Sequence, residues 1–398
     1  QEFRVPAKMD AHTDIQESLK EIRTYMQSQE KQQKAVEDLY QRGLLPIVNF
    51  ANFMGKSVLE TMLYFAASPK HKIFVCKQIT NEFETALKTL SKNCRIVIDE
   101  TAIATIFMLD IYKSLDELPF DLIIPESLLF ELRKTITLAC ANKRSDLYLG
   151  ISNGELVVQR VTPTEHANWI NSLEELLTAL INHCSIEGGR ALLEFEPESR
   201  EQLIQAMRPP NADAVAIAKK NNIIYWTDDQ LYGALAAKLQ IQNVWSQVIL
   251  HFIKDVDEKY TKKYNLATKK LFLWGYDFTL VTVSTLIDII KDAKWNINDR
   301  QVDYIEQFIS KLGAINPRNS FCTCCLFAEI WIKCPKRKVA RKLILRLLKS
   351  VKEHESPAKL ARFIYRGQHE LFRLNVNPKI RGLRRMLRRW RMNPNLCE

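Results

Sequence analysis

The chain has 398 residues, of which 46% are hydrophobic and 26% are charged, proportions typical of a folded globular protein and not of a disordered one. No uninterrupted run of about eighteen apolar residues occurs, which argues against a membrane-spanning helix. The nine cysteines are odd in number and scattered, which favours a reducing, cytoplasmic environment over a disulfide framework.

The length exceeds that of one ordinary domain and predicts two or three structural units. The sequence opens with QEFRVPAK, which contains no apolar signal segment, and the missing initiator Met suggests a processed chain or a piece of a longer one. The formal charge of +11 is concentrated at one end, because Lys336 to Glu398 contains nineteen Lys or Arg and only four acidic residues. The preceding part, with 38 basic and 42 acidic groups, is close to neutral.

A long polar helix is predicted near the N-terminus, from a capping box at Thr13 to about Gln41. Its apolar seam consists of Ile15, Leu19, Ile22 and Met26. Such a seam requires a partner helix, and we expect an intramolecular hairpin, with a homo-oligomer or larger complex formed through this helix as the alternative. Two short apolar helices are predicted between Leu44 and Ala67, on either side of Gly55.

Strands alternate with helices from Ile73 to Trp245, which predicts an α/β domain with a parallel sheet and helices on both faces. The runs predicted as strands are 73–76, 95–98, 122–125, 223–226 and 241–245, and the helices between them are 81–91, 100–115, 126–142 and 211–222. Asn153-Gly154 lies between alternating apolar stretches and predicts a hairpin. With the helical pattern at 163–207, this hairpin is interpreted as an insertion at about 145–207 that covers one edge of the sheet.

The pattern is helical from about Phe252 to the C-terminus. Four cysteines in this part invite comparison with a zinc site: Cys322, Cys324, Cys325 and Cys334. They lack paired Cys-x-x-Cys spacing and lie in an apolar helical pattern, so we expect them to pack as small apolar side chains. The predicted organisation is therefore a helical region at 1–70, an α/β domain at 71–250 and a helical domain with a basic tail at 251–398.

Acidic residues recur where the predicted strands end. Asp99 follows one buried strand, Glu131 lies about one turn into the helix after the next, Asp213 begins a helix, and Asp228 and Asp229 follow the strand that ends at 226. Because ligands of parallel sheets gather beyond the carboxyl ends of the strands, we expect these acids to meet in one pocket. Each acid taken singly also fits a helix cap, which is the alternative interpretation.

Three segments carry a resemblance to a known family: IVIDETAI, LIIPESLLFELR and NADAVAIAKKNNIIYWTDDQL resemble the first, second and joined third and fourth motifs of PIN-domain nucleases. The resemblance covers roughly residues 73–244 and implies a PIN-like three-layer α/β fold. It implies a metal-dependent endonuclease that hydrolyses phosphodiester bonds, with RNA favoured over DNA. The added helical regions also resemble those of bacterial conflict or defence PIN proteins, which implies a toxin or defence effector.

The resemblance also implies roles for individual residues. The implied catalytic metal ligands are Asp99, Glu131, Asp213 and Asp229, with Asp228 as the alternative to Asp229, and the implied positioning residues are Thr101 and Thr227. The expected ion is Mg²⁺ or Mn²⁺, since hard cations prefer oxygen ligands. Replacing Asp99 or Asp213 by Asn is then expected to abolish cleavage without unfolding the chain. Glu100 stands where the family often has a hydroxyl residue, and this departure supports a second hypothesis, a catalytically inactive PIN-like scaffold that binds nucleic acid or a protein partner.

The basic C-terminal end contains two amphipathic patterns that predict a nucleic-acid interface, because Lys and Arg clusters neutralise phosphates without reading sequence. The candidate residues are Lys336, Arg337, Lys338, Arg341, Lys342, Arg381, Arg384, Arg385, Arg388, Arg389 and Arg391. The surplus of basic residues is larger than solubility requires, which favours nucleic acid over an anionic membrane and over a merely solvated face.

Overall fold

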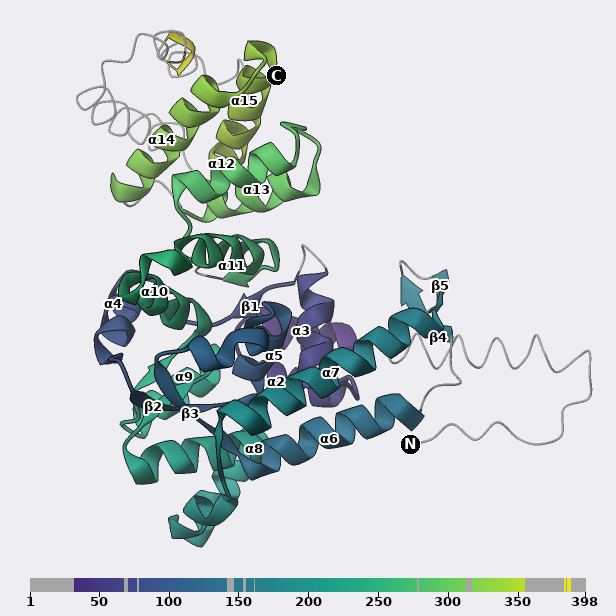
Figure 1. The fold of residues 1–398 in the computed structure, drawn as a ribbon. Helices are drawn as coiled ribbons and strands as arrows, with labels where there is room; N and C mark the ends of the chain where they lie inside the picture. Colours follow the sequence, from purple (N-terminus) through teal and green to yellow (C-terminus); the bar gives the residue numbers. More distant parts are fainter. Residues whose placement is uncertain are drawn as a thin grey trace, which may run out of the picture. The chain divides into compact units, whose positions relative to one another are not determined.

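The computed structural model describes residues 32–67, 71–76, 79–141, 147–152, 155–160, 162–277, 279–312, 317–354, 383 and 385–387 (Figure 1). The chain divides into two compact units, one drawn from 1–64 and 73–253 and the other from 65–72 and 254–398. Among the helices in the described ranges, none combines the length and the apolar character needed to cross a bilayer. The predicted N-terminal seam lies outside the described residues, and the part of that helix that is described is helical at 32–41.

The first unit is built on a parallel sheet that, within the described residues, has five strands in the order β6-β3-β2-β7-β8. The strands are β2 (Cys94–Ile98), β3 (Phe120–Pro125), β6 (Ser185–Glu187), β7 (Ile224–Trp226) and β8 (Asn243–Val244). All four pairings are parallel. The central strands β2 and β7 are covered on both sides, which explains their continuous apolar runs. These observations confirm the predicted parallel α/β fold.

The helices around this sheet follow the predicted alternation (Figure 1). They are α2 (Ile47–Phe53), α3 (Val58–Ala66), α4 (Ile79–Thr89), α5 (Glu100–Met108), η1 (Ile111–Glu117), α6 (Glu126–Ala141), α7 (Pro163–His183), η2 (Gly189–Glu194), α8 (Pro197–Asn221), α9 (Gln230–Lys238) and α10 (Ser246–Val256). Gly55, between α2 and α3, has a φ of 63°, a left-handed conformation that glycine adopts without strain. The two predicted short helices on either side of it are confirmed.

The segment predicted as an insertion contains more than a hairpin and helices. Strands β4 (Leu147–Ser152) and β5 (Glu155–Arg160) form the predicted antiparallel hairpin. The strand β6, however, was not predicted, and it pairs with β3 at the edge of the central sheet. β6 is only three residues long and Ile186 within it is 47% exposed, so it has neither the buried run nor the alternation that marks a strand in a sequence.

Helix α8 is broken at Arg208, whose φ of 67° and ψ of 158° are not helical. Pro209 and Pro210 follow it, and a residue that precedes proline is disfavoured in the α conformation. The second segment of α8 therefore starts close to Asn211 and packs along the buried strands with Ala212 to Ala218 almost fully inaccessible to solvent. The break sets the orientation of this second segment, and therefore the side on which its polar residues lie.

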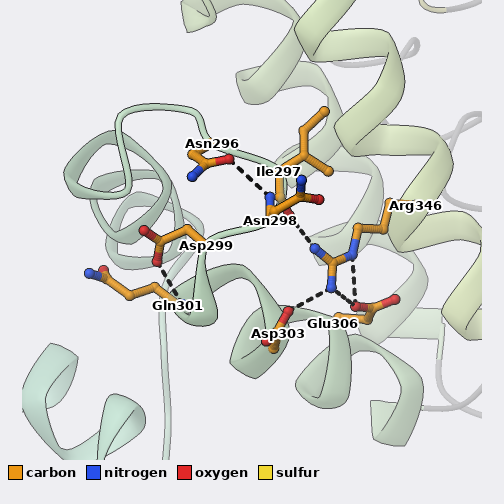
Figure 2. Close-up of polar contacts among 8 residues, drawn as sticks. All are labelled: Asn296, Ile297, Asn298, Asp299, Gln301, Asp303, Glu306 and Arg346. Carbon is orange, nitrogen blue, oxygen red and sulfur yellow. Dashed lines mark hydrogen bonds and ion pairs between the residues drawn. The ribbon is translucent and has the colours of Figure 1, made fainter.

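The second unit is predominantly helical. Its elements are η3 (Glu258–Tyr260), α11 (Thr261–Leu273), β9 (Tyr276–Asp277), α12 (Val283–Asp292), α13 (Arg300–Leu312), α14 (Pro317–Lys333) and α15 (Arg337–His354). The short strand β1 (Ile73–Phe74), which belongs to the first unit, lies outside the central sheet. Arg346 of α15 donates to Asp303 (2.6 Å) and Glu306 (2.9 Å) of α13, and to the carbonyl oxygen of Ile297 (Figure 2). This network joins α15 to α13 and to the loop before it.

Candidate functional site

Asp99 lies directly after β2 and caps helix α5. Its Oδ1 accepts hydrogen bonds from the Ala102 amide (2.8 Å) and the Thr101 hydroxyl (2.7 Å), and its Oδ2 accepts one from the Tyr225 hydroxyl (2.8 Å). The side chain is fully buried, and this burial raises the pKa of Asp99 although the hydrogen bonds act in the opposite direction. Both oxygens of the first predicted ligand are thus occupied by protein donors.

The two predicted positioning residues meet beside Asp99. The hydroxyl oxygens of Thr101 and Thr227 are 3.3 Å apart, and Thr101 Oγ1 accepts a hydrogen bond from the Asp228 amide (2.8 Å). The register of the sheet explains this proximity, because Ile98 of β2 is paired with Trp226 of β7. The two strand ends are therefore brought together, as the sequence predicted.

Asp228 and Asp229 diverge from each other after β7. Asp228 accepts from the Ser246 amide (2.8 Å) and the Ser246 hydroxyl, at the start of α10. Asp229 caps α9 by accepting from the Leu231 and Tyr232 amides, and its other oxygen accepts from the Ile47 amide of α2 (2.7 Å). Burial raises the pKa of Asp228 to about 6 and that of Asp229 to about 7. These contacts make Asp229 the N-cap of α9, whereas Asp228 is bonded to the distant Ser246.

Asp213 is directed toward helix α6 and the loop before η2. Its Oδ2 accepts a hydrogen bond from the Ser127 hydroxyl (2.5 Å). Its Oδ1 lies so close to Gly189 that a Cβ atom on this glycine would be 2.9 Å away, which explains why no side chain stands there. Burial raises the pKa of Asp213. The polar residue of this helix that contacts the neighbourhood of Asp99 is not Asp213 but Asn211.

Asn211 and Glu100 form a pair that the sequence analysis did not assign. Asn211 Oδ1 accepts from the Glu100 amide (3.1 Å), and Asn211 Nδ2 donates to Glu100 Oε2 (3.3 Å). Burial raises the pKa of Glu100 to about 7, Arg208 opposes this rise, and the negative charges of Asp99 and Glu131 add to it. Glu100 therefore lies within the electrostatic reach of both predicted ligands. The Arg208-Pro209-Pro210 sequence signalled the helix break that brings this pair together.

Glu131 and Glu100 both line one cavity, which we call the acid pocket, of about 410 Å³. Glu131 makes an exposed ion pair with Lys134 (3.3 Å), one turn further along α6. The described residues that line the pocket are Asn52, Gly55, Lys56, Ser57, Glu60, Glu100, Glu131, Lys134, Thr135, Leu138, Ala139, His166, Trp169 and Arg208. The pocket thus combines carboxylates with cationic side chains, a mixture suited to an anionic ligand that carries its own counter-ion.

The metal ligands predicted from the sequence stay a prediction. Within the described ranges, no three His, Cys, Asp or Glu side chains are grouped so as to hold a metal ion. Asp99, Asp228 and Asp229 each accept hydrogen bonds from protein donors at both carboxylate oxygens. Mg²⁺ usually takes one or two carboxylates and keeps water and substrate oxygens as its other ligands. Glu100 and Glu131 both line the same pocket, where both oxygens of Glu131 accept from Lys134 Nζ, at 3.5 and 3.3 Å.

Those basic candidate residues that the structure describes lie in the second unit. Lys336, Arg337, Lys338, Arg341 and Lys342 are exposed at the start of α15, and Arg385 is exposed as well. The candidates Arg381, Arg384, Arg388, Arg389 and Arg391 lie outside the described residues. The apolar face of α15 is buried in the core of this unit, which leaves the basic face of the helix toward solvent.

The cysteines in and just after α14 differ in exposure: Cys324 and Cys334 are buried, Cys325 is intermediate and Cys322 is exposed. Burial raises the pKa of Cys324 to about 12 and that of Cys325 to about 11. The predicted packing as small apolar side chains therefore holds for Cys324 and Cys334.

Part of the chain matches a known family. Residues 97–238 match the family model described as "PIN domain associated with the TPR-GreAB-C-PIN system". A search of curated proteins and a search of solved structures each returned no match. The matched segment starts within β2 and ends with α9, so it contains the strand-end acids and most of the acid pocket.

Proposed function

We propose that this PIN-domain protein, in which additional helical regions accompany the PIN domain, is a metal-dependent endonuclease with its reaction centre in the acid pocket. RNA is the proposed substrate over DNA, because most PIN-domain nucleases act on RNA. The observation that carries the proposal is the placement of two accessible carboxylates, Glu100 and Glu131, in one cavity with Arg208 and Lys134. The PIN family match supports the reaction class.

In this proposal Glu100 and Glu131 hold Mg²⁺ or Mn²⁺ together with water and a phosphate oxygen of the substrate. The bound ion supplies an activated water and neutralises charge that develops on the phosphate. Arg208 and Lys134 bind the non-bridging oxygens, since a guanidinium is well matched to a phosphate and an ammonium acts as a point charge. Asp99 acts indirectly: its negative charge raises the pKa of Glu100, while the Asn211 side-chain amide holds the Glu100 carboxylate by a hydrogen bond.

The exposed basic residues of α15 are proposed to bind the nucleic-acid backbone. Their role is electrostatic, so affinity should fall steeply with salt and depend little on sequence. This surface is separate from the reaction chemistry, and variants such as Arg341→Glu and Lys342→Glu should weaken binding without changing the rate of cleavage at saturating substrate.

A second candidate function is a PIN-like scaffold that binds nucleic acid without cleaving it. The observation that favours it is the complete hydrogen bonding of Asp99, Asp228 and Asp229 by protein donors. The two candidates differ in a single readout, which is whether the bound nucleic acid is shortened in the presence of Mn²⁺.

The test uses the full chain, Mn²⁺ and fluorescently labelled single-stranded RNA and DNA. We expect cleavage of RNA by the wild type and a loss of about 10²-fold or more in Glu100→Gln and in Glu131→Gln. Glu174→Gln, an exposed position on α7, is the matched control and should cleave like the wild type. Binding without cleavage by the wild type would support the scaffold, and full activity in both Glu100→Gln and Glu131→Gln would refute the assignment of the pocket.

A further inference from the structure

A second cavity, of about 500 Å³, lies between α4 and α9 beside the edge strand β8, and we call it the α4–α9 cavity. Its size is within the range of small-molecule sites, about 300–1,000 Å³. It shares no lining residue with the acid pocket. The described residues that line it are Val75, Cys76, Glu82, Thr85, Ala86, Thr89, Gln230, Gly233, Ala234, Ala237, Gln240, Ile241, Gln242, Asn243 and Trp245.

The lining combines apolar walls with neutral hydrogen-bonding groups. Four carboxamide side chains line it, those of Gln230, Gln240, Gln242 and Asn243. Among the described lining residues Glu82 is the only charged one, and no Lys or Arg is present. A phosphate group would find no counter-charge there, so the chemistry favours an uncharged ligand with polar edges.

Trp245 contributes a donor that has no partner among the described residues. The side chain is 4% exposed, and its Nε1 has no hydrogen-bond partner within the described part of the chain. Trp226 nearby in sequence shows the usual arrangement, because its Nε1 donates to the Ser246 hydroxyl (3.1 Å). A buried N–H without an acceptor is unfavourable, and a ligand with an acceptor atom would remove that cost.

Gly233 fixes the position of one of the carboxamides. A Cβ atom at this position of α9 would lie 2.8 Å from Asn243 Nδ2. The amide of Asn243 therefore packs directly against the helix backbone, at the end of the cavity next to β8. Any side chain at Gly233 would have to displace it.

We propose that the α4–α9 cavity binds a neutral nucleobase or nucleoside. A carboxamide presents a donor and an acceptor side by side and pairs with the edge of a base in this way, as Asn and Gln do with adenine. The Trp245 indole N–H supplies a further donor for a ring nitrogen or a carbonyl oxygen. The apolar walls contributed by Ala86, Ala234 and Ile241 cover the faces of a flat heterocycle.

The test is isothermal titration of the full-length chain with four probes, namely adenosine, guanosine, cytidine and uridine. We expect at least one of them to bind at one site per chain with a dissociation constant below about 1 mM, the weak end of specific binding. Trp245→Phe removes the N–H and keeps an aromatic ring, so it should weaken binding about three- to tenfold, as expected for one neutral hydrogen bond. Gly233→Ala and the cavity-filling Ala234→Leu should weaken it further.

Trp274→Phe, which changes a tryptophan of the second unit, is the matched control and should bind like the wild type. Circular dichroism of each variant separates loss of binding from loss of folding, and Ala234 is partly exposed, so its replacement by Leu is compatible with the fold. Absence of saturable binding by all four nucleosides would overturn the proposal. Equal binding by the wild type, Trp245→Phe and Ala234→Leu would overturn it too, because the ligand would then occupy another site.

Discussion

Asp99 provides the sharpest test of whether the strand-end acids are structural. Replacing Asp99 by Ala removes the hydrogen bond that caps the Ala102 amide, and the loss of such a cap lowers the free energy of unfolding by about 1 kcal/mol. It also leaves the buried Tyr225 hydroxyl without its acceptor, which costs about 1–3 kcal/mol. Together these losses predict that the free energy of unfolding falls by roughly 2–4 kcal/mol.

Asp99→Asn is the matched variant, since its carbonyl oxygen can accept from Ala102 and its amide can donate to the Tyr225 oxygen. The substitution also replaces a buried acid, whose ionised form is disfavoured by burial, with a neutral amide. We therefore expect the free energy of unfolding to change by no more than about 1 kcal/mol. Urea unfolding of the two variants measures the difference directly. If Asp99→Ala is as stable as Asp99→Asn, the hydrogen-bond network around Asp99 is not the one described. Asp99→Asn should retain measurable cleavage, in contrast to the abolition implied by the family resemblance.

Three further predictions concern stability. Burial raises the pKa of Asp228 to about 6, so the native state holds the proton of this carboxyl more tightly than the unfolded chain does. Relative to the Asp228→Asn variant, the wild type should therefore lose roughly 2 kcal/mol of unfolding free energy between about pH 4.5 and pH 7.5. A stability difference between the two proteins that does not change with pH would contradict the assignment. Gly189→Ala should destabilise by about 1–3 kcal/mol in thermal unfolding, with Gly188→Ala nearly neutral as its control. Arg346→Ala should lower the stability of the second unit by about 1–3 kcal/mol in denaturant unfolding, and an unchanged midpoint would show that the network is dispensable.

The arrangement of the sheet was largely predictable because buried parallel strands leave a clear trace in the sequence. The strands β2, β3 and β7 each end in a buried apolar run, and each is followed by a helix pattern. Because parallel strands align at their carboxyl ends, Asp99 after β2 lies beside Thr227 after β7, whereas the strand order was not predicted. β6 left no such trace because it is short and partly exposed.

The side-chain geometry of the site was less predictable than its position. Sequence spacing cannot distinguish a carboxylate that caps a helix from one that faces a pocket, since both stand at the start of a helix. Asp229 and Asp213 illustrate this, because their partners Ile47 and Ser127 are distant in sequence. The pairing of Asn211 with Glu100 depends on the break in α8 at Arg208. The direction that the helix takes after this break can be seen only in the three-dimensional structure.

The central claim is that Glu100 and Glu131 are the carboxylates that act in the acid pocket, and Mn²⁺-dependent thermal stabilisation of the full-length chain tests it most directly. The account predicts that Mn²⁺ raises the unfolding midpoint of the wild type and of Asp213→Asn, and that Glu100→Gln combined with Glu131→Gln removes the effect. Stabilisation that persists in the double variant, or that disappears in Asp213→Asn alone, would contradict it.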